Sequence, residues 1–318
     1  MNKGLFVFIA GLFTPSIIWA LENISQIAFN EAFAVATVIT DSNALTFGVA
    51  NFDLDYFVET DGSEEALNLK KSLQVLVLPY TWKLNDLEDG WSQSVTVRAF
   101  HIQIARDNQF LQGVNNFEKE KMMGGYAQYQ QQYAITKNWY GQAGLGLHLS
   151  YYINEFNYGN NFPEHIKDEL NGSVFNTTAL ALIAEPHLNF GYKKSEDWGQ
   201  WTLHNSNHYI SGRGIAGEAE NVEGIRPEGW RIGNGVELKF DVPNLFGVAD
   251  FVAFDFVRID IGGDISGLSD DGHYYETGIS WVIDTNKKIP FLDNIGVGLK
   301  LNHGSSLSGG TLVFYYNE

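Results

Sequence analysis

The sequence predicts an all-β fold, a transmembrane antiparallel up-and-down β-barrel of about 12 strands with a short N-terminal helix. Two observations carry this prediction. Long stretches of the chain alternate between apolar and polar residues, which gives each strand one apolar and one polar face. The connections between these stretches alternate between long polar loops and short turns, as expected when every strand crosses a membrane.

The composition agrees with a wall that has one apolar and one polar face. Aromatic residues make up 14% of the 318-residue chain and charged residues 18%, with 33 glycines. The net charge of −18 argues against nucleic acid as a partner, because its phosphates would be repelled. The absence of cysteine excludes disulfides, thiolate metal sites and a cysteine nucleophile. Composition alone leaves a soluble β-sandwich as the alternative.

Residues 1–20 have the features of an export signal. Lys3 supplies a positive charge, residues 5–13 form a short apolar core, and Pro15 interrupts it. Residues 18–20 (Ile-Trp-Ala) offer a cleavage site that ends in a small residue. Because the apolar core is too short for a membrane-spanning helix, we predict a cleaved signal peptide.

A short segment over residues 21–43 precedes the barrel domain, which is predicted over 44–318. Between 23 and 40 its apolar residues loosely follow helical spacing, and residues 41–43 (Asp-Ser-Asn) would end a helix. We therefore expect a helical lead or plug inside or beneath the barrel. An additional strand through 33–39 is the alternative.

The clearest alternation lies between residues 139 and 154. One face is apolar and the other is polar or small, which is typical of a strand between lipid and lumen. The apolar face carries Trp139, Ala143, Leu145, Leu147, Leu149, Tyr151 and Ile153. Residues 180–192 and 230–240 repeat the pattern. The segment 251–261 carries aromatic and acidic residues on both faces, so its orientation is ambiguous.

Connection lengths provide an independent test of the barrel. The predicted strands lie near 45–56, 72–84, 92–105, 122–135, 139–154, 176–192, 199–211, 229–242, 247–261, 273–284, 294–303 and 308–316. Long polar segments follow the odd-numbered strands, at 57–71, 106–121, 155–175, 212–228 and 262–272. Shorter connections follow the even-numbered strands, and only the last outside loop departs from this order. A soluble sandwich has no reason to sort its loops in this way.

The chain ends with Ser-Gly-Gly-Thr-Leu-Val-Phe-Tyr-Tyr over 308–316. The helical lead, about 12 strands and this ending together resemble autotransporter translocator barrels. With no passenger ahead of it, the chain is most similar to the solitary outer-membrane autotransporter barrels. The resemblance implies a Gram-negative outer-membrane location, outer-membrane lipids around the barrel, and the barrel-assembly machinery as partner during insertion. The usual terminal aromatic residue is absent, because Asn317 and Glu318 follow Tyr316.

The tetrad at 204–207 (His-Asn-Ser-Asn) is the sharpest candidate for catalysis. His204 and Ser206 are two residues apart on a predicted strand and share a face, so the imidazole could act as general base for the hydroxyl. Glu218 or Asn234 would orient the imidazole. The tetrad resembles the His-x-Ser-Asn motif of outer-membrane phospholipase A and the lipid A deacylases. This resemblance implies a serine acyl hydrolase acting in the outer leaflet.

The predicted facing of this strand opposes the catalytic interpretation. Parity points His204 and Ser206 into the lumen, whereas a site that cleaves lipid should open toward the membrane. The glycine that follows the motif in the phospholipases is His208 here. The other face carries the large apolar or aromatic side chains of Trp201, Leu203 and Tyr209. We therefore expect a structural role for the pair, with acyl hydrolysis as the alternative.

Other ionisable residues on polar faces are predicted to line the lumen, where paired charges would join neighbouring strands. They are His148, Glu185, His187, Arg231, Glu237, Lys239, Glu276 and Lys300. His101, His148 and His187 lack close ligand spacing, so neither a metal nor another cofactor is predicted.

The leading functional prediction is a non-enzymatic outer-membrane barrel of the solitary autotransporter type, with a structural, surface or small-channel role. The first alternative is an acyl hydrolase that uses Ser206 and His204, and the second is a narrow diffusion pore. The sequence does not determine the ligand, the conductance or the oligomeric state.

Overall fold

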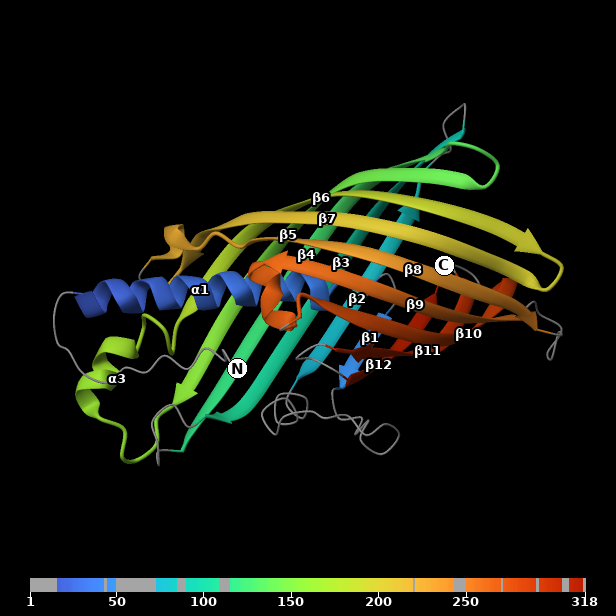
Figure 1. The fold of residues 1–318 in the computed structure, drawn as a ribbon. Helices are drawn as coiled ribbons and strands as arrows, with labels where there is room; N and C mark the ends of the chain where they lie inside the picture. The colour runs from blue at the N-terminus through green and yellow to red at the C-terminus, as the bar shows by residue number, and fades with distance from the viewer. Residues whose placement is uncertain are drawn as a thin grey trace.

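The computed structural model describes residues 16–42, 45–49, 73–84, 90–108, 115–219, 221–242, 250–269, 271–289, 292–304 and 309–316. Within these residues the chain forms a closed barrel of antiparallel strands (Figure 1). The strands are β1 (Leu45–Val49), β2 (Gln74–Lys83), β3 (Trp91–Asn108), β4 (Asn116–Ala134), β5 (Trp139–Asn157), β6 (Thr178–Glu196), β7 (Gly199–Gly217), β8 (Glu228–Val242), β9 (Asp250–Gly263), β10 (His273–Ile289), β11 (Leu292–His303) and β12 (Gly309–Tyr316). The all-β barrel prediction is confirmed.

The first strand closes the barrel. β1 pairs on one side with β12, where Thr46 lies opposite Val313, and on the other side with β2, where Thr46 lies opposite Val77. Closure leaves no free sheet edge, so the backbone polar groups of the wall can be paired between strands.

The two ends of the barrel differ in their connections. One end carries the connections that follow odd-numbered strands, including α3 (Glu164–Leu170), η3 (Val222–Gly224) and η4 (Asp264–Leu268); we call it the long-loop end. The other carries the connections that follow even-numbered strands, and we call it the turn end. Some strands extend into segments predicted as loops, such as β4 from Asn116 and β7 to Gly217. They extend because ladder hydrogen bonds do not require apolar side chains.

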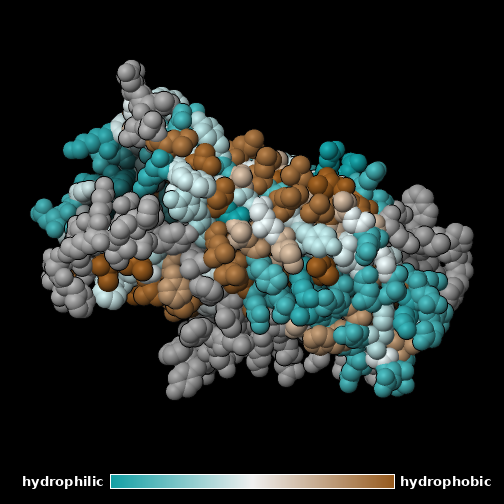
Figure 2. All heavy atoms as spheres, turned by 180° about the vertical axis from the view of Figure 1, so that it is seen from behind, coloured by the Kyte–Doolittle hydropathy of each residue, from teal (hydrophilic) through white to brown (hydrophobic). Residues whose placement is uncertain are grey.

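The outer face of the wall is an apolar coat. Along β5, Leu145, Leu147 and Leu149 are exposed, as their alternation predicts. In Figure 2 apolar residues gather across the middle of the barrel, and polar residues gather toward its ends. Aromatic pairs on neighbouring strands mark the turn end: the rings of Trp139 and Tyr192 are 5.1 Å apart. A continuous apolar surface of this kind on a closed barrel requires lipid around it.

Among the described residues, no helix is long and apolar enough to cross a membrane.

The helix α1 (Ser16–Ile39) enters the barrel at the long-loop end, and its later turns, from Phe29 onward, are buried inside (Figure 1). It begins earlier than the predicted segment 21–43, while residues 1–15 of the predicted signal peptide lie outside the described part of the chain. The helical prediction is confirmed over the strand alternative. The proposed cleavage after Ala20 stays a prediction.

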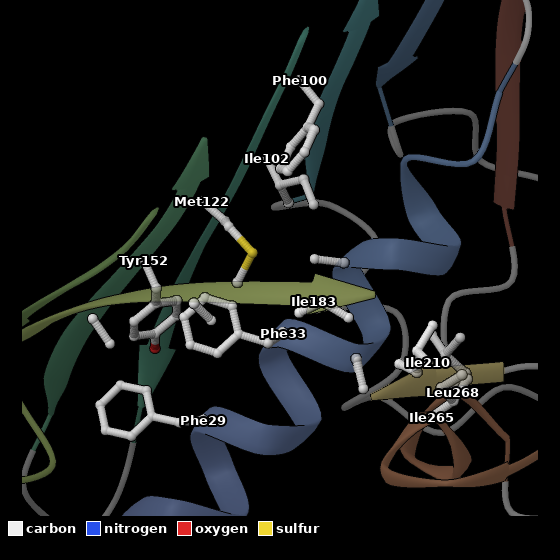
Figure 3. Close-up of a cluster of buried hydrophobic side chains, with 14 of the residues drawn as sticks. Phe29, Phe33, Phe100, Ile102, Met122, Tyr152, Ile183, Ile210, Ile265 and Leu268 are labelled. Atoms are coloured by element: carbon white, nitrogen blue, oxygen red, sulfur yellow. The ribbon is translucent and has the colours of Figure 1, made fainter. Parts of the chain in front are cut away.

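The interior of the long-loop half is an apolar core rather than a polar lumen. Phe33 of α1 is fully buried, and its ring lies 6.2 Å from that of Tyr152 on β5. Ile183 on β6 and Ile210 on β7 meet the helix from the other side (Figure 3). The inner wall of this half is apolar where it meets α1, because it must match the apolar face of the helix.

The same packing explains the ambiguous segment 251–261. On β9, Phe254 and Phe256 face outward and are exposed, whereas Ile261 faces inward and is buried in the core around α1. Both faces are apolar in places because one meets lipid and the other meets the helix.

Candidate functional site

The inner end of α1 is fixed by ion pairs to the barrel wall. The Thr40 hydroxyl donates to the Ala36 carbonyl at 2.7 Å as the helix ends, and Asp41 follows. Arg98 Nη1 on β3 lies 2.7 Å from Asp41 Oδ1, and Arg231 Nη2 on β8 donates to Asp41 Oδ2. Because β3 and β8 stand on nearly opposite sides of the barrel, Asp41 joins two walls across the lumen.

Glu185 on β6 is the second acidic centre and is 1% exposed. Its Oε1 atom accepts from Arg231 Nη2 at 2.9 Å and lies 2.7 Å from His208 Nδ1. Its Oε2 atom lies 2.5 Å from His148 Nε2. A buried carboxylate needs such partners, since an unpaired charge in this environment is strongly disfavoured.

Aromatic rings enclose the ion pairs. The Arg98 guanidinium lies 4.5 Å from the centroid of the Tyr126 ring, and that ring lies 4.4 Å from the ring of His148. The rings of His187 and His208 are stacked at 5.2 Å. We call this group the lumen network; its members are Asp41, Arg98, Tyr126, His148, Glu185, His187, His208 and Arg231.

The carboxylates and guanidinium groups of the network are equal in number. Burial acts to raise the pKa of Asp41, but the guanidinium groups of Arg231 and Arg98 hold that pKa well below its ordinary value. Two carboxylates therefore face two guanidinium groups. The arginines also offset the partial negative charge at the C-terminus of α1, where an aspartate is otherwise unfavourable.

Three of these groups are close enough to hold a metal ion, but a side chain already lies between them. Ligand atoms of Asp41, Glu185 and His208 lie within 4.8 Å of one another. Arg231 Nη2 contacts an atom of each, with His208 Nδ1 at 3.2 Å. The guanidinium thus supplies the positive charge that a metal would bring, so the geometry favours an ion-pair network over a metal centre.

A cavity of about 440 Å³ lies on the turn-end side of the network. Polar side chains from several strands form its wall. They include Lys83, Thr96, Gln128, Gln130, His187, Asn189, Ser206 and His208. The lumen therefore consists of an apolar half filled by α1 and a polar half with open space.

The structure places the predicted lumen-lining residues on the inner face of the wall. His148, Glu185, His187 and Arg231 belong to the lumen network. Two further ion pairs lie beyond it: Lys300 Nζ is 2.8 Å from Glu276 Oε1, and Lys239 Nζ is 3.4 Å from Glu237 Oε1. Any role of these residues in conduction stays a prediction.

Sequence reasoning missed Asp41, Arg98, Tyr126 and His208 as members of the network. His208 shares its face of β7 with Ser206, so strand parity alone could have found it. Asp41 carried no such signal, because its role depends on the position of α1 within the barrel.

The candidate pair His204 and Ser206 faces the lumen, in agreement with the parity of the strand. Both lie opposite glycines of β8, and a Cβ added to Gly233 would be 2.6 Å from the Ser206 Oγ. Ser206 lines the 440 Å³ cavity. Within the described residues, no hydrogen bond joins His204 to Ser206.

Neither predicted orienting group lies beside His204. Asn234 is on the outer face of β8, where its Oδ1 atom accepts from Asn205 Nδ2 at 2.9 Å. Glu218 lies beyond the end of β7, and its backbone N–H donates to the Thr178 carbonyl at 3.0 Å. The catalytic role stays a prediction, and this placement favours the structural interpretation.

Replacing Ser206 by alanine is expected to leave phospholipid and lipid A acylation unchanged, because the hydroxyl faces the lumen rather than lipid. The measurement is lipid mass spectrometry of cells that express each form, together with an acyl-hydrolase assay on purified protein. Ser211→Ala, on the exposed outer face of the same strand, is the matched control. If the wild type hydrolyses acyl esters, and Ser206→Ala abolishes this activity while Ser211→Ala does not, the protein is an acyl hydrolase that uses Ser206.

Comparisons with known proteins give a family match and several distant structural similarities. The model of a family described as "Solitary outer membrane autotransporter beta-barrel domain" matches residues 30–318. The β domain of the Bordetella autotransporter BrkA is similar, at 14% identity and a TM-score of 0.45, over 77% of this chain and 90% of that one. The transport unit of AIDA-I from Escherichia coli shows 9% identity and a TM-score of 0.49, over 93% and 99%.

A third similar structure is LpxR from Salmonella typhimurium, at 9% identity and a TM-score of 0.41, over 85% of this chain and 97% of that one. Comparison with curated protein sequences finds no match.

Proposed function

The chain belongs to the solitary outer-membrane autotransporter β-barrel family, and from this premise we propose that it is a closed, non-enzymatic barrel that presents its long-loop end at the cell surface. It is an integral outer-membrane protein. The observation that carries the proposal is the filled lumen: α1 occupies the long-loop half and is anchored at its inner end by Asp41.

An open diffusion pore is less well supported. A permeating solute would have to displace Phe33 and its neighbours from an apolar core, and then break the ion pairs of Asp41 with Arg98 and Arg231. Both steps are unfavourable, because they expose apolar surface and leave charges unpaired at low dielectric.

The long-loop end has structure of its own, which supports a surface role. Phe156 and Phe175 stack at 3.9 Å, and Phe162 and Leu170 pack against them as a small buried cluster around α3. Burial beside this cluster raises the pKa of Tyr158 to about 12. In barrels of this class the longer loops face outside and the short turns face the periplasm, so this end would be exposed on the cell.

We propose the barrel-assembly machinery as the partner during insertion. The support is β12, where Leu312 and Phe314 lie on the face opposite the fully buried Val313, which gives the strand an outward apolar face. Depletion of that machinery should reduce the folded, heat-modifiable form of the protein.

Planar-bilayer recordings test the closed barrel directly. The wild type is expected to show no stable conductance, whereas Asp41→Ala should produce intermittent channel openings because the inner anchor of α1 is lost. Asp260→Ala is the matched control, since Asp260 forms a 2.7 Å ion pair with Arg258 on β9 outside the lumen. It should remain silent.

Steady current through the wild type would contradict the proposal and favour a diffusion pore. If neither the wild type, Asp41→Ala, nor a form that lacks residues 21–43 conducts, the barrel has no pore function, with or without its plug.

A further inference from the structure

A polar patch interrupts the apolar outer coat on three adjacent strands. On β7 it lies between the exposed side chains of Leu203 and Tyr209, where strand parity calls for lipid-facing apolar residues. We call it the outer polar patch, and its members are Asn205, Asn207, Asn234, Arg258 and Asp260. Residues of this kind are rare on the lipid face of a membrane barrel.

The register of the strands places the patch at the level of the apolar coat. On β6, Phe190 lies opposite Asn205 and Leu188 lies opposite Asn207, and both apolar side chains are more than 40% exposed, at 41% and 46%. Since paired residues share a row of the sheet, the amides meet the same acyl region as these two side chains.

The row continues across the next two strands. Asn234 follows Ile232 and Gly233 on β8 and lies opposite Asn205 on one side and Arg258 on the other. Arg258 follows the exposed Phe256 by two residues on the same face of β9. Polar side chains therefore lie side by side on β7, β8 and β9, within an otherwise apolar outer surface.

Internal hydrogen bonds satisfy only part of the patch. Asn207 Nδ2 donates to Asn205 Oδ1 at 2.6 Å and to the Leu188 carbonyl at 2.9 Å, while Asn205 Nδ2 donates to Asn234 Oδ1. Within the described residues, the Asn234 Nδ2 group has no acceptor. Acyl chains cannot supply one.

The ion pair of the patch also remains open on its outer side. Arg258 and Asp260 join through Nη2 and Oδ1 at 2.7 Å, yet their side chains are 47% and 31% exposed. The pair lies toward the long-loop end, since Asp260 is opposite His273, the first residue of β10. A polar partner would meet its two charges more favourably than lipid would.

We propose that a second copy of this chain covers the outer polar patch and forms a twofold-symmetric dimer in the membrane. A twofold interface requires a surface that complements itself. This patch does: each amide both donates and accepts, and Arg258 of one copy can meet the partner's Asp260 while its own Asp260 meets the partner's Arg258. Hydrogen bonds between polar side chains are an established means of association within a bilayer.

Charge favours a second copy over an anionic lipid headgroup as the occupant. The patch contains one cation and one anion, so its net charge is zero, and the carboxylate of Asp260 lies beside the guanidinium of Arg258. Glu228, at the end of β8, adds a further negative group and accepts a hydrogen bond from the Tyr209 hydroxyl. A phosphate at this position would meet two carboxylates and one guanidinium.

Cysteine cross-linking in native membranes tests the dimer, because the chain contains no cysteine of its own. Asn205→Cys is expected to form a disulfide-linked dimer on oxidation. Leu147→Cys, equally outward-facing on β5, is the matched control and should stay monomeric. Equal cross-linking of the two variants, or none from Asn205→Cys and from Asn234→Cys, would overturn the proposal.

A second measurement compares self-association in detergent by light scattering. The double variant Asn205→Leu and Asn234→Leu keeps an outer face compatible with lipid, and its folding is checked by heat-modifiable migration. Its dimer dissociation constant should be roughly ten times that of the wild type. This is the effect of losing one or two hydrogen bonds between polar side chains within a membrane. A monomeric wild type that retains glycolipid, which the double variant loses, would assign the patch to lipid and overturn the dimer.

Discussion

Replacing Glu185 by alanine is expected to lower the free energy of unfolding by about 3–5 kcal/mol. The carboxylate is 1% exposed and receives Arg231, His208 and His148. Its removal leaves Arg231 with Asp41 as its carboxylate partner and takes the carboxylate partner from two imidazoles in a buried region. Because the network joins β5, β6, β7 and β8, the loss should affect the whole barrel. Urea unfolding in detergent micelles, followed by tryptophan fluorescence, measures it.

The matched control for this variant is Glu237→Ala. Glu237 also faces the lumen and forms an ion pair, with Lys239 at 3.4 Å, but both side chains are about 30% exposed, at 31% and 30%. A solvated pair of this kind contributes about 0–1 kcal/mol. If the two variants lose equal stability, burial of the network is not what makes Glu185 important.

Replacing Phe33 by alanine is expected to cost about 3–5 kcal/mol, chiefly in the docking of α1. The side chain is fully buried between the helix and the wall, with the rings of Tyr152 and Phe29 at one side of the cluster (Figure 3). The strands pair through their backbones and do not depend on this contact. The barrel should therefore stay folded while α1 becomes accessible.

Hydrogen exchange of α1, combined with circular dichroism of the barrel, separates these two effects. In Phe33→Ala the amides of α1 should exchange faster, and the strand signal should be unchanged. Ile27→Ala is the control, because Ile27 lies on the same helix but is 45% exposed. Unchanged protection of α1 in Phe33→Ala would show that the ion pairs of Asp41 hold the helix without the apolar core.

The outer face of the barrel could be predicted from the sequence almost strand by strand. Leu145, Leu147 and Leu149 are exposed as their spacing predicted, and His204 and Ser206 face inward as parity predicted. Such predictions succeed because the direction of a side chain alternates along any strand, and because lipid imposes one polarity on everything it touches.

Strand ends were less predictable than strand positions. β7 continues to Gly217, past the predicted end near 211, through a glycine-rich stretch (212–217, Gly-Arg-Gly-Ile-Ala-Gly) that resembles a loop. Backbone pairing with β6 sustains this extension, and side-chain polarity does not report it. The predicted orienting groups fail for a related reason: Asn234 has suitable chemistry, but the register puts it on the opposite face from His204.

The sequence by itself determined the class of fold, the number and facing of the strands, and the helical lead, since each follows from local periodicity. Only the tertiary structure decided what fills the lumen and which charges meet there. Asp41 joins Arg98 and Arg231, and through Arg231 reaches Glu185, although these residues lie far apart along the chain. Closure of the barrel brings them together, and closure depends on the pairing of β1 with β12, which no local pattern encodes.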